Sequence, residues 1–184
     1  MGIYKLSWLS KEFVEAKEDT TPLEKFWYNL KQNPSKDSRR DLYDFMTANK
    51  MPITPNGHFI AYKKVRANYK DCHTGTICNR PGRVIKMLRE EVDADRTHLC
   101  SSGLHAAAFA YANAGPMGHG ILLEVEINPR DVVAVPPDYK QQKMRVCRYR
   151  VIQEATKEIT SLIYCREPIK TAYENLGPDN EIVG

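Results

Sequence analysis

Apolar residues in the N-terminal third of the chain recur with the period of an α-helix. In TPLEKFWYNLKQNP the apolar positions, spaced three, four and seven apart, are Leu23, Phe26, Trp27 and Leu30. Thr21 is the predicted N-cap, with Pro22 at the first helical position and Glu24 completing a capping box. Pro34 is expected to end this helix.

A second amphipathic helix is predicted directly afterwards, in SKDSRRDLYDFMTANK. Ser38 is its predicted N-cap. Its apolar residues are Leu42, Tyr43, Phe45 and Met46. Two short helices joined in this way form a helical hairpin. We expect its aromatic side chains to pack on the rest of the domain, and a surface for a partner protein is the alternative.

Beyond the hairpin, the pattern changes to that of β-strands. Pro-Asn-Gly at 55–57 is a strong turn signal. The predicted strands are Phe59–Val65, Ile121–Ile127, Asp131–Val135 and Met144–Ile152, with EITSLIYC (158–165) as a further candidate. Basic and apolar residues alternate in KMRVCRYRVI, as expected of a strand with one solvated face.

The order of these elements predicts an α+β fold. An N-terminal helical hairpin is followed by a mostly antiparallel sheet with one inserted short helix, expected where the polar turn THLCSSG leads into LHAAAFAYANAG. We expect three regions: an N-terminal helical extension packed on the core (1–50), an α+β core domain (51–168) and a polar tail (169–184).

Composition narrows the class of protein. Hydrophobic residues make up 42% of the 184 residues and charged residues 27%, as in ordinary globular chains. The net charge of +4 permits an anionic ligand, but scattered basic residues argue against nucleic acid as the partner. No apolar run approaches the roughly 18 residues of a membrane span, and no signal peptide is evident. Five irregularly spaced cysteines fit reduced thiols in a cytosol.

Metal and nucleophile chemistry are both weakly indicated. The residues of metal-ligand type are Cys72, His73, Cys78, His98 and Cys100. Their spacing fits no common zinc module, so we expect no metal. Cys100 lies at a turn that would favour a thiolate if a helix began there, with His105 nearby in sequence. Because no acidic partner stands out, we expect no catalytic residue and no cofactor.

Anion binding is the better-supported chemistry. Helix N-termini bind phosphate through free amides and the helix dipole. The turn offers hydroxyls from Ser101 and Ser102, close backbone approach at Gly103, and the imidazole of His105. The basic residues expected on nearby strands are Lys63, Lys64, Arg145, Arg148 and Arg150. An ordinary capped helix beside a solvated basic strand accounts for the same residues, so both interpretations stay open.

Several unbroken motifs resemble the rIIB-like proteins of tailed bacteriophages. They are MPITPNGHFIAYKKV, DCHTGTICNRPGRVIKM, EEVDAD, CSSGLH and DVVAVPPDYKQQKMRVCRY, and they run from about Leu42 to Ile152. The resemblance implies a phage product acting in the cytoplasm of the infected bacterium, in a family tied to lysis control and escape from host exclusion. It implies no particular reaction.

A second resemblance concerns fold. SSGLHAAAFAYANAGPMGHGILLEVEI is similar in layout to a segment of ADP-ribosyltransferases. It places His105 at the position of their nicotinamide-stacking tyrosine, and Phe59–Val65 at their first motif strand, where AYKK replaces a His-Gly-Thr motif. The catalytic glutamate falls near Ala134 or Val135, which cannot stabilise the positive charge that develops on the sugar. Histidine at the tyrosine position also occurs in the RNA phosphotransferase branch of that superfamily.

These observations together predict a phage counter-defence protein that acts in host immune evasion. It would bind and sequester a nucleotide-like host signal, of ADP-ribose or cyclic-nucleotide type. The predicted ligand-binding residues are Ser101, Ser102, Gly103, His105, Tyr62, Lys64, Arg145 and Arg148. The alternatives are an ADP-ribosyltransferase-like enzyme acting on NAD or an ADP-ribose group, and a non-catalytic inhibitor of a host defence protein. A homo-oligomer is left open.

Overall fold

The computed structural model describes residues 8–114, 119–137, 142–164 and 181–183. The helices are α1 (Trp8–Glu15), α2 (Thr21–Lys31), α3 (Lys36–Asn49) and α4 (Phe109–Ala114), with 3-10 turns η1 (Arg89–Glu91) and η2 (Pro129–Asp131). The strands are β1 (Phe59–Val65), β2 (Val84–Lys86), β3 (Leu104–Ala107), β4 (Ile121–Ile127), β5 (Val132–Ala134), β6 (Lys143–Val146), β7 (Arg148–Glu154) and β8 (Glu181–Val183).

The strands form one sheet in the order β5-β6-β3-β1-β4-β7-β2-β8. Every pairing is antiparallel except that of β2 with β8. The pairing of β1 with β4 is continuous from Phe59↔Ile127 to Val65↔Ile121, whereas β1 and β3 pair only at Tyr62↔Ala107. The predicted α+β class is therefore confirmed, and so are the predicted strands Phe59–Val65 and Ile121–Ile127, which are β1 and β4.

The polar turn leads into strand β3, so the predicted start of the inserted helix at Leu104 was wrong. β3 pairs with β6 from Leu104↔Val146 to Ala107↔Lys143, and α4 begins only at Phe109. Alanine favours helix locally, but tertiary pairing overrides that small preference. His105 therefore lies within a sheet and not in the first turn of a helix.

Both predicted N-caps were also wrong. Asp19 accepts the backbone N–H of Thr21 at 2.9 Å, and Thr20 occupies the N-cap position of α2. Ser35 caps α3 through its Oγ, which accepts the N–H of Ser38 at 3.1 Å. Ser38 instead donates its hydroxyl to the carbonyl of Val133 at 2.6 Å. The hydroxyls of Thr21 and Ser38, which were predicted as caps, thus bond to Asp19 and Val133 and do not cap their helices.

The remaining strand predictions need smaller corrections. The run predicted as one strand at 144–152 is two, β6 and β7, separated by Cys147, whose N–H donates to Asp131 at 2.9 Å. Within the described part of 158–165 there is no strand, only an isolated bridge from Ile163 to Ile53. Helix α1 and strand β2 were not predicted. Most of the predicted polar tail lies outside the described residues, and β8 adds a strand to the sheet there.

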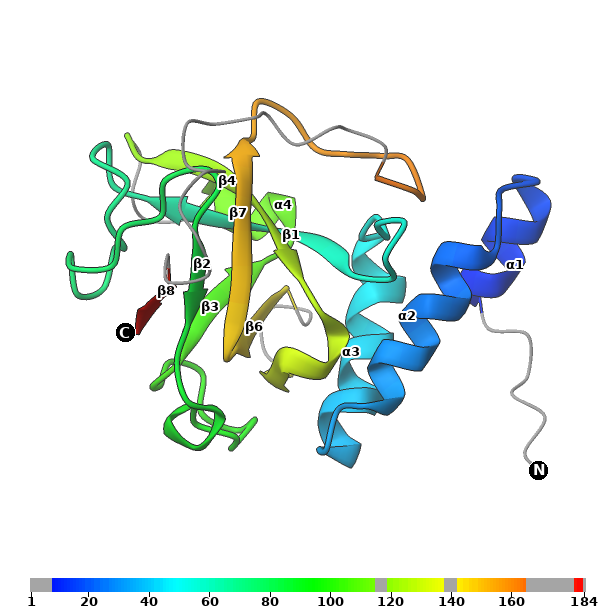
Figure 1. The fold of residues 1–184 in the computed structure, drawn as a ribbon, viewed down its shortest axis with the longest axis horizontal. Coiled ribbons are helices and arrows are strands. Elements are labelled where there is room, and N and C mark those ends of the chain that lie inside the picture. The colour runs from blue at the N-terminus through cyan, green and yellow to red at the C-terminus, as the bar shows by residue number, and fades with distance from the viewer. Residues whose placement is uncertain (1–7, 115–118, 138–141, 165–180, 184) are drawn as a thin grey trace.

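Helices α1 to α3 lie together beside one end of the sheet (Figure 1). Phe26 contacts Phe59 edge-on, with ring centroids 6.4 Å apart. The fully buried Asn33 donates from Nδ2 to the carbonyls of Pro129 at 2.9 Å and Val132 at 2.7 Å. An apolar contact therefore joins α2 to β1, and buried polar contacts join the helical region to η2 and β5.

Candidate functional site

His105 lies at the centre of a group of positively charged side chains. It is half-buried on β3, directly opposite Arg145 on β6. Burial is the largest cause that lowers the pKa of His105 to about 4, followed by the charges of Lys63, Arg145, Lys143 and His73 in that order. Among the described residues, nothing hydrogen-bonds to its ring nitrogens. At neutral pH the ring is therefore uncharged, with one donor and one acceptor available.

Lys63 approaches His105 from the neighbouring strand. Its Nζ donates to the His105 carbonyl at 2.9 Å, just beyond the single β1–β3 pair, and lies 5.5 Å from the centroid of the Tyr149 ring. Burial of this ammonium lowers its pKa, and Asp71 opposes part of the shift. Asp71 accepts hydrogen bonds within its own loop, and no carboxylate of the described residues forms an ion pair with Lys63.

Arg145 is fully buried and is surrounded by carbonyl oxygens. Nε donates to Asp93 O at 2.8 Å, Nη1 to His98 O at 2.7 Å and Nη2 to Asp95 O at 2.6 Å. None of these partners carries a negative charge at the accepting atom. The guanidinium thus organises the 93–98 loop, to which each of its three nitrogens donates one hydrogen bond.

The turn before His105 closes against this loop. Gly103 has φ +143°, and a Cβ there would lie 2.8 Å from Val92 Cγ1 and 3.3 Å from Arg145 Cδ. Ser102 donates its hydroxyl to the Glu91 carbonyl at 2.8 Å. A hydrogen bond from Ser101 is the largest of several that lower the pKa of Asp93. The turn therefore contacts the 91–93 segment, and both hydroxyls already have protein partners.

Lys143 is a further cation that sequence reasoning missed. It is buried, with Nζ 3.9 Å from Cys100 Sγ and 5.9 Å from the centroid of the Tyr111 ring. The predicted strand began one residue later, at Met144, and Lys143 was not among the predicted ligand-binding residues. The spacing of two residues between Lys143 and Arg145 in KMRV could have shown that both lie on the same face of a strand. The cations Lys63, Lys143 and Arg145, together with the uncharged His105 ring between them, form what we call the cation cluster.

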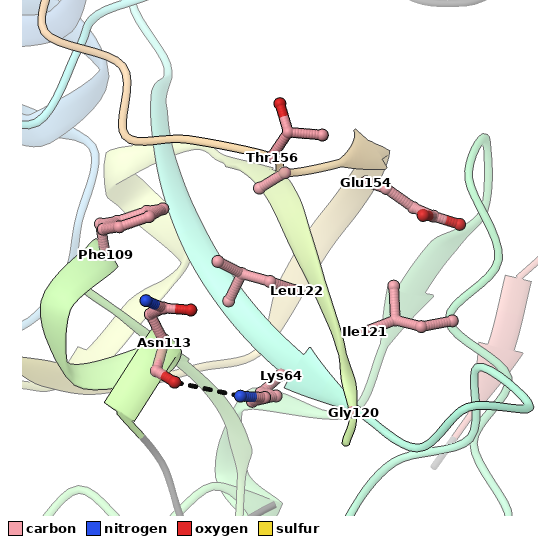
Figure 2. Close-up of a pocket in the computed structure, with 9 residues that line it drawn as sticks. Lys64, Phe109, Asn113, Gly120, Ile121, Leu122, Glu154 and Thr156 are labelled. Carbon is pink, nitrogen blue, oxygen red and sulfur yellow. Dashed lines mark hydrogen bonds between the residues drawn. The ribbon is translucent and has the colours of Figure 1, made fainter. Parts of the chain in front are cut away.

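Lys64 and Tyr62 lie outside this cluster, and Lys64 is next to a cleft of about 440 Å³. Lys64 lines the cleft and donates from Nζ to the Asn113 carbonyl at 3.0 Å (Figure 2). Tyr62 is buried; its hydroxyl accepts the Ile159 N–H at 2.9 Å, and its ring meets Phe109 edge-on at 5.1 Å.

Arg148 is distant from both places. It is exposed on β7, opposite Lys86 of β2, and β7 lies three positions from β3 in the sheet order. The structure thus divides the predicted ligand-binding residues. The turn and Arg145 lie around His105, and Lys64 lines the cleft. Tyr62 is buried against Phe109, and Arg148 is near neither place.

The described residues contain neither a metal-binding group nor a membrane-spanning helix. No group of three or more His, Cys, Asp or Glu side chains in the described ranges is placed to hold a metal ion. No helix in those ranges is long and apolar enough to cross a bilayer.

The depressed pKa of His105 predicts a loss of stability in acid. The unfolded chain binds a proton at this residue near pH 6.5, but the folded protein does so only near pH 4, so acid between these values favours unfolding. Wild-type protein is expected to lose about 2 kcal/mol more than His105→Asn between pH 7 and pH 5. Urea unfolding at both pH values measures the difference. Equal losses in the two proteins would show that folding does not depress the pKa of His105.

Comparison with known proteins places the chain in a family. No solved structure matches it, and the expected likeness to ADP-ribosyltransferases is not shown. The family described as "Bacteriophage T4 protein rIIB" matches residues 11–161. "Protein rIIB" of Enterobacteria phage T4 is 43% identical over 133 residues, which are 72% of this chain and 43% of that protein. The chain thus spans less than half the length of that relative. The resemblance noted in the motifs is confirmed, and the chain belongs to the rIIB family of bacteriophage proteins.

Proposed function

We propose that this phage protein binds a small, nucleotide-like anion at the cation cluster and sequesters it from host defence. The observation that carries the proposal is the His105 ring, which has no hydrogen-bond partner in the described structure and is flanked by Lys63 and Arg145. Neither cation is in an ion pair with a described carboxylate.

The energetics of buried charge support a negatively charged ligand. Each guanidinium nitrogen of Arg145 donates to a carbonyl oxygen, but these uncharged acceptors leave its net charge uncompensated. A buried cation without a counter-ion is costly, and an anion would relieve that cost. A phosphate would accept from Lys63 and from the N–H of His105, in charge-assisted bonds stronger than neutral ones. The phage family supplies the setting, an infected bacterium.

Mass spectrometry of retained ligand tests the proposal. Purified protein is mixed with NAD, ADP-ribose, its cyclic isomers and cyclic dinucleotides, freed of unbound ligand by gel filtration, and heat-denatured. One compound recovered unaltered, in equimolar amount, is the expected result. A converted compound or a modified protein would favour the ADP-ribosyltransferase-like enzyme. If nothing is retained, the ligand proposal is wrong, and partners pulled from infected cells would test a host defence protein as the target.

A pair of lysine variants makes the test specific to the cluster. Lys63→Met is expected to lower retention at least tenfold, since one charge-assisted hydrogen bond is lost. It also removes an enclosed charge, so the free energy of unfolding should not fall, which separates loss of binding from loss of fold. Lys157→Met, at an exposed lysine after β7, is the matched control and should bind like wild type.

A further inference from the structure

The cleft beside Lys64 is lined from three directions. Helix α4 contributes Phe109 and Asn113, strand β4 contributes Leu122, and the segment after β7 contributes Thr156. In Figure 2 the Phe109 ring and the Asn113 side chain extend from α4 toward the space above Leu122. Its volume of about 440 Å³ is within the range of small-molecule sites, roughly 300–1,000 Å³.

The charges around the cleft balance. Lys64 brings one ammonium, which is held by the Asn113 carbonyl. Glu154 brings one carboxylate, which accepts a hydrogen bond from the hydroxyl of Tyr69. One charge of each sign, each with a protein partner, gives the cleft no preference for an anion. It differs in this respect from the cation cluster.

Among the uncharged polar side chains that line the cleft, the Asn113 carboxamide offers a donor and an acceptor on separate atoms. Within the part of the chain that the structure describes, no hydrogen bond reaches this side chain, and the residue is exposed. A carboxamide offers a donor and an acceptor side by side, which suits the edge of a heterocycle that carries both. The Phe109 ring and the aliphatic Leu122 offer apolar surface to the faces of such a ring.

We propose that this cleft is a second small-molecule site, which holds an uncharged planar heterocycle of purine type. Phe109 and Leu122 contact the faces of the ring, and Asn113 hydrogen-bonds its edge. The site is separate from the cation cluster because α4 carries Phe109 and Asn113, four residues apart, toward the cleft, and Tyr111 toward Lys143. It therefore goes beyond the anion-binding function and does not depend on it.

Uncharged adenosine, with ribose as a control for its sugar, is the probe in equilibrium dialysis. Adenosine is expected to bind at one site with a Kd of about 1 mM or tighter, and ribose is not. Asn113→Ala is expected to weaken binding about fivefold and Phe109→Leu about tenfold. Tyr28→Leu, which removes an exposed aromatic ring on α2, is the matched control and should change nothing.

Two outcomes would overturn the second site. One is the absence of saturable adenosine binding up to about 5 mM. The other is adenosine binding that Lys63→Met abolishes but Asn113→Ala leaves unchanged, because the probe would then occupy the cation cluster. Asn113 is exposed, so its variant is expected to fold even if Phe109→Leu disturbs the contact with Tyr62. Failure of the anion proposal would leave the adenosine result unaffected.

Discussion

Gly57→Ala is expected to lower the free energy of unfolding by about 3 kcal/mol or more. Gly57 has φ +73°, in the left-handed region, and an added Cβ would lie 2.4 Å from both Lys25 C and Phe26 N. These are backbone atoms in the middle of α2, so neither can move without displacing the helix. The turn is also bonded to α2 through Asn29, whose Nδ2 donates to the Gly57 carbonyl at 3.1 Å.

Gly75→Ala is the matched control for this variant. Gly75 has φ +72°, almost the same backbone conformation, but the three atoms nearest to its added Cβ all belong to the guanidinium of Arg66, the closest at 3.0 Å. That flexible side chain can move, so the control reports the backbone cost alone, about 1 kcal/mol. The difference between the free energies of unfolding that the two variants lose, measured in urea, gives the cost of the clash between the 54–57 turn and α2. If the two losses are equal, that contact does not constrain Gly57.

The predictions that succeeded for the fold rest on strong local patterns. β1 and β4 are apolar runs with β-branched residues, buried over most of their length, and both were predicted to the residue. β3 was missed because LHAA carries no strand signal of its own, and only its pairing with β6 makes it a strand. Gly57 was recognised as a turn residue, but its close approach to α2 is a tertiary fact with no local signature.

The candidate site was predictable to a smaller extent. His105 and Arg145 were named together, and the structure does place them opposite each other. The sequence does not distinguish a basic residue that binds a ligand from one that organises a loop. Arg145 was expected on the solvated face of a strand, whereas it is buried against the 93–98 loop. The cleft had no signal, because Phe109 and Thr156 come from distant segments and neither residue type suggests chemistry.

Arg145→Met is expected to lower the free energy of unfolding by about 3 kcal/mol. The substitution keeps much of the apolar stem but removes three donors at 2.6–2.8 Å, which leaves the carbonyls of Asp93, Asp95 and His98 without their partner. Arg145→Lys keeps the charge but cannot reach all three oxygens, so an intermediate loss is expected. Arg148→Met, at an exposed arginine on β7, should change stability by less than about 0.5 kcal/mol.

The same variants decide what Arg145 does for ligand binding. Because its donors point at the loop, a variant that remains folded under the assay conditions should lose less ligand retention than Lys63→Met, whose ammonium lies beside His105. Thermal unfolding and ligand retention, measured on the same preparations, separate the two roles. If Arg145→Met abolishes retention at unchanged stability, the guanidinium is a ligand-binding group. The bonds to the 93–98 loop would then contribute little to the fold, contrary to what their geometry predicts.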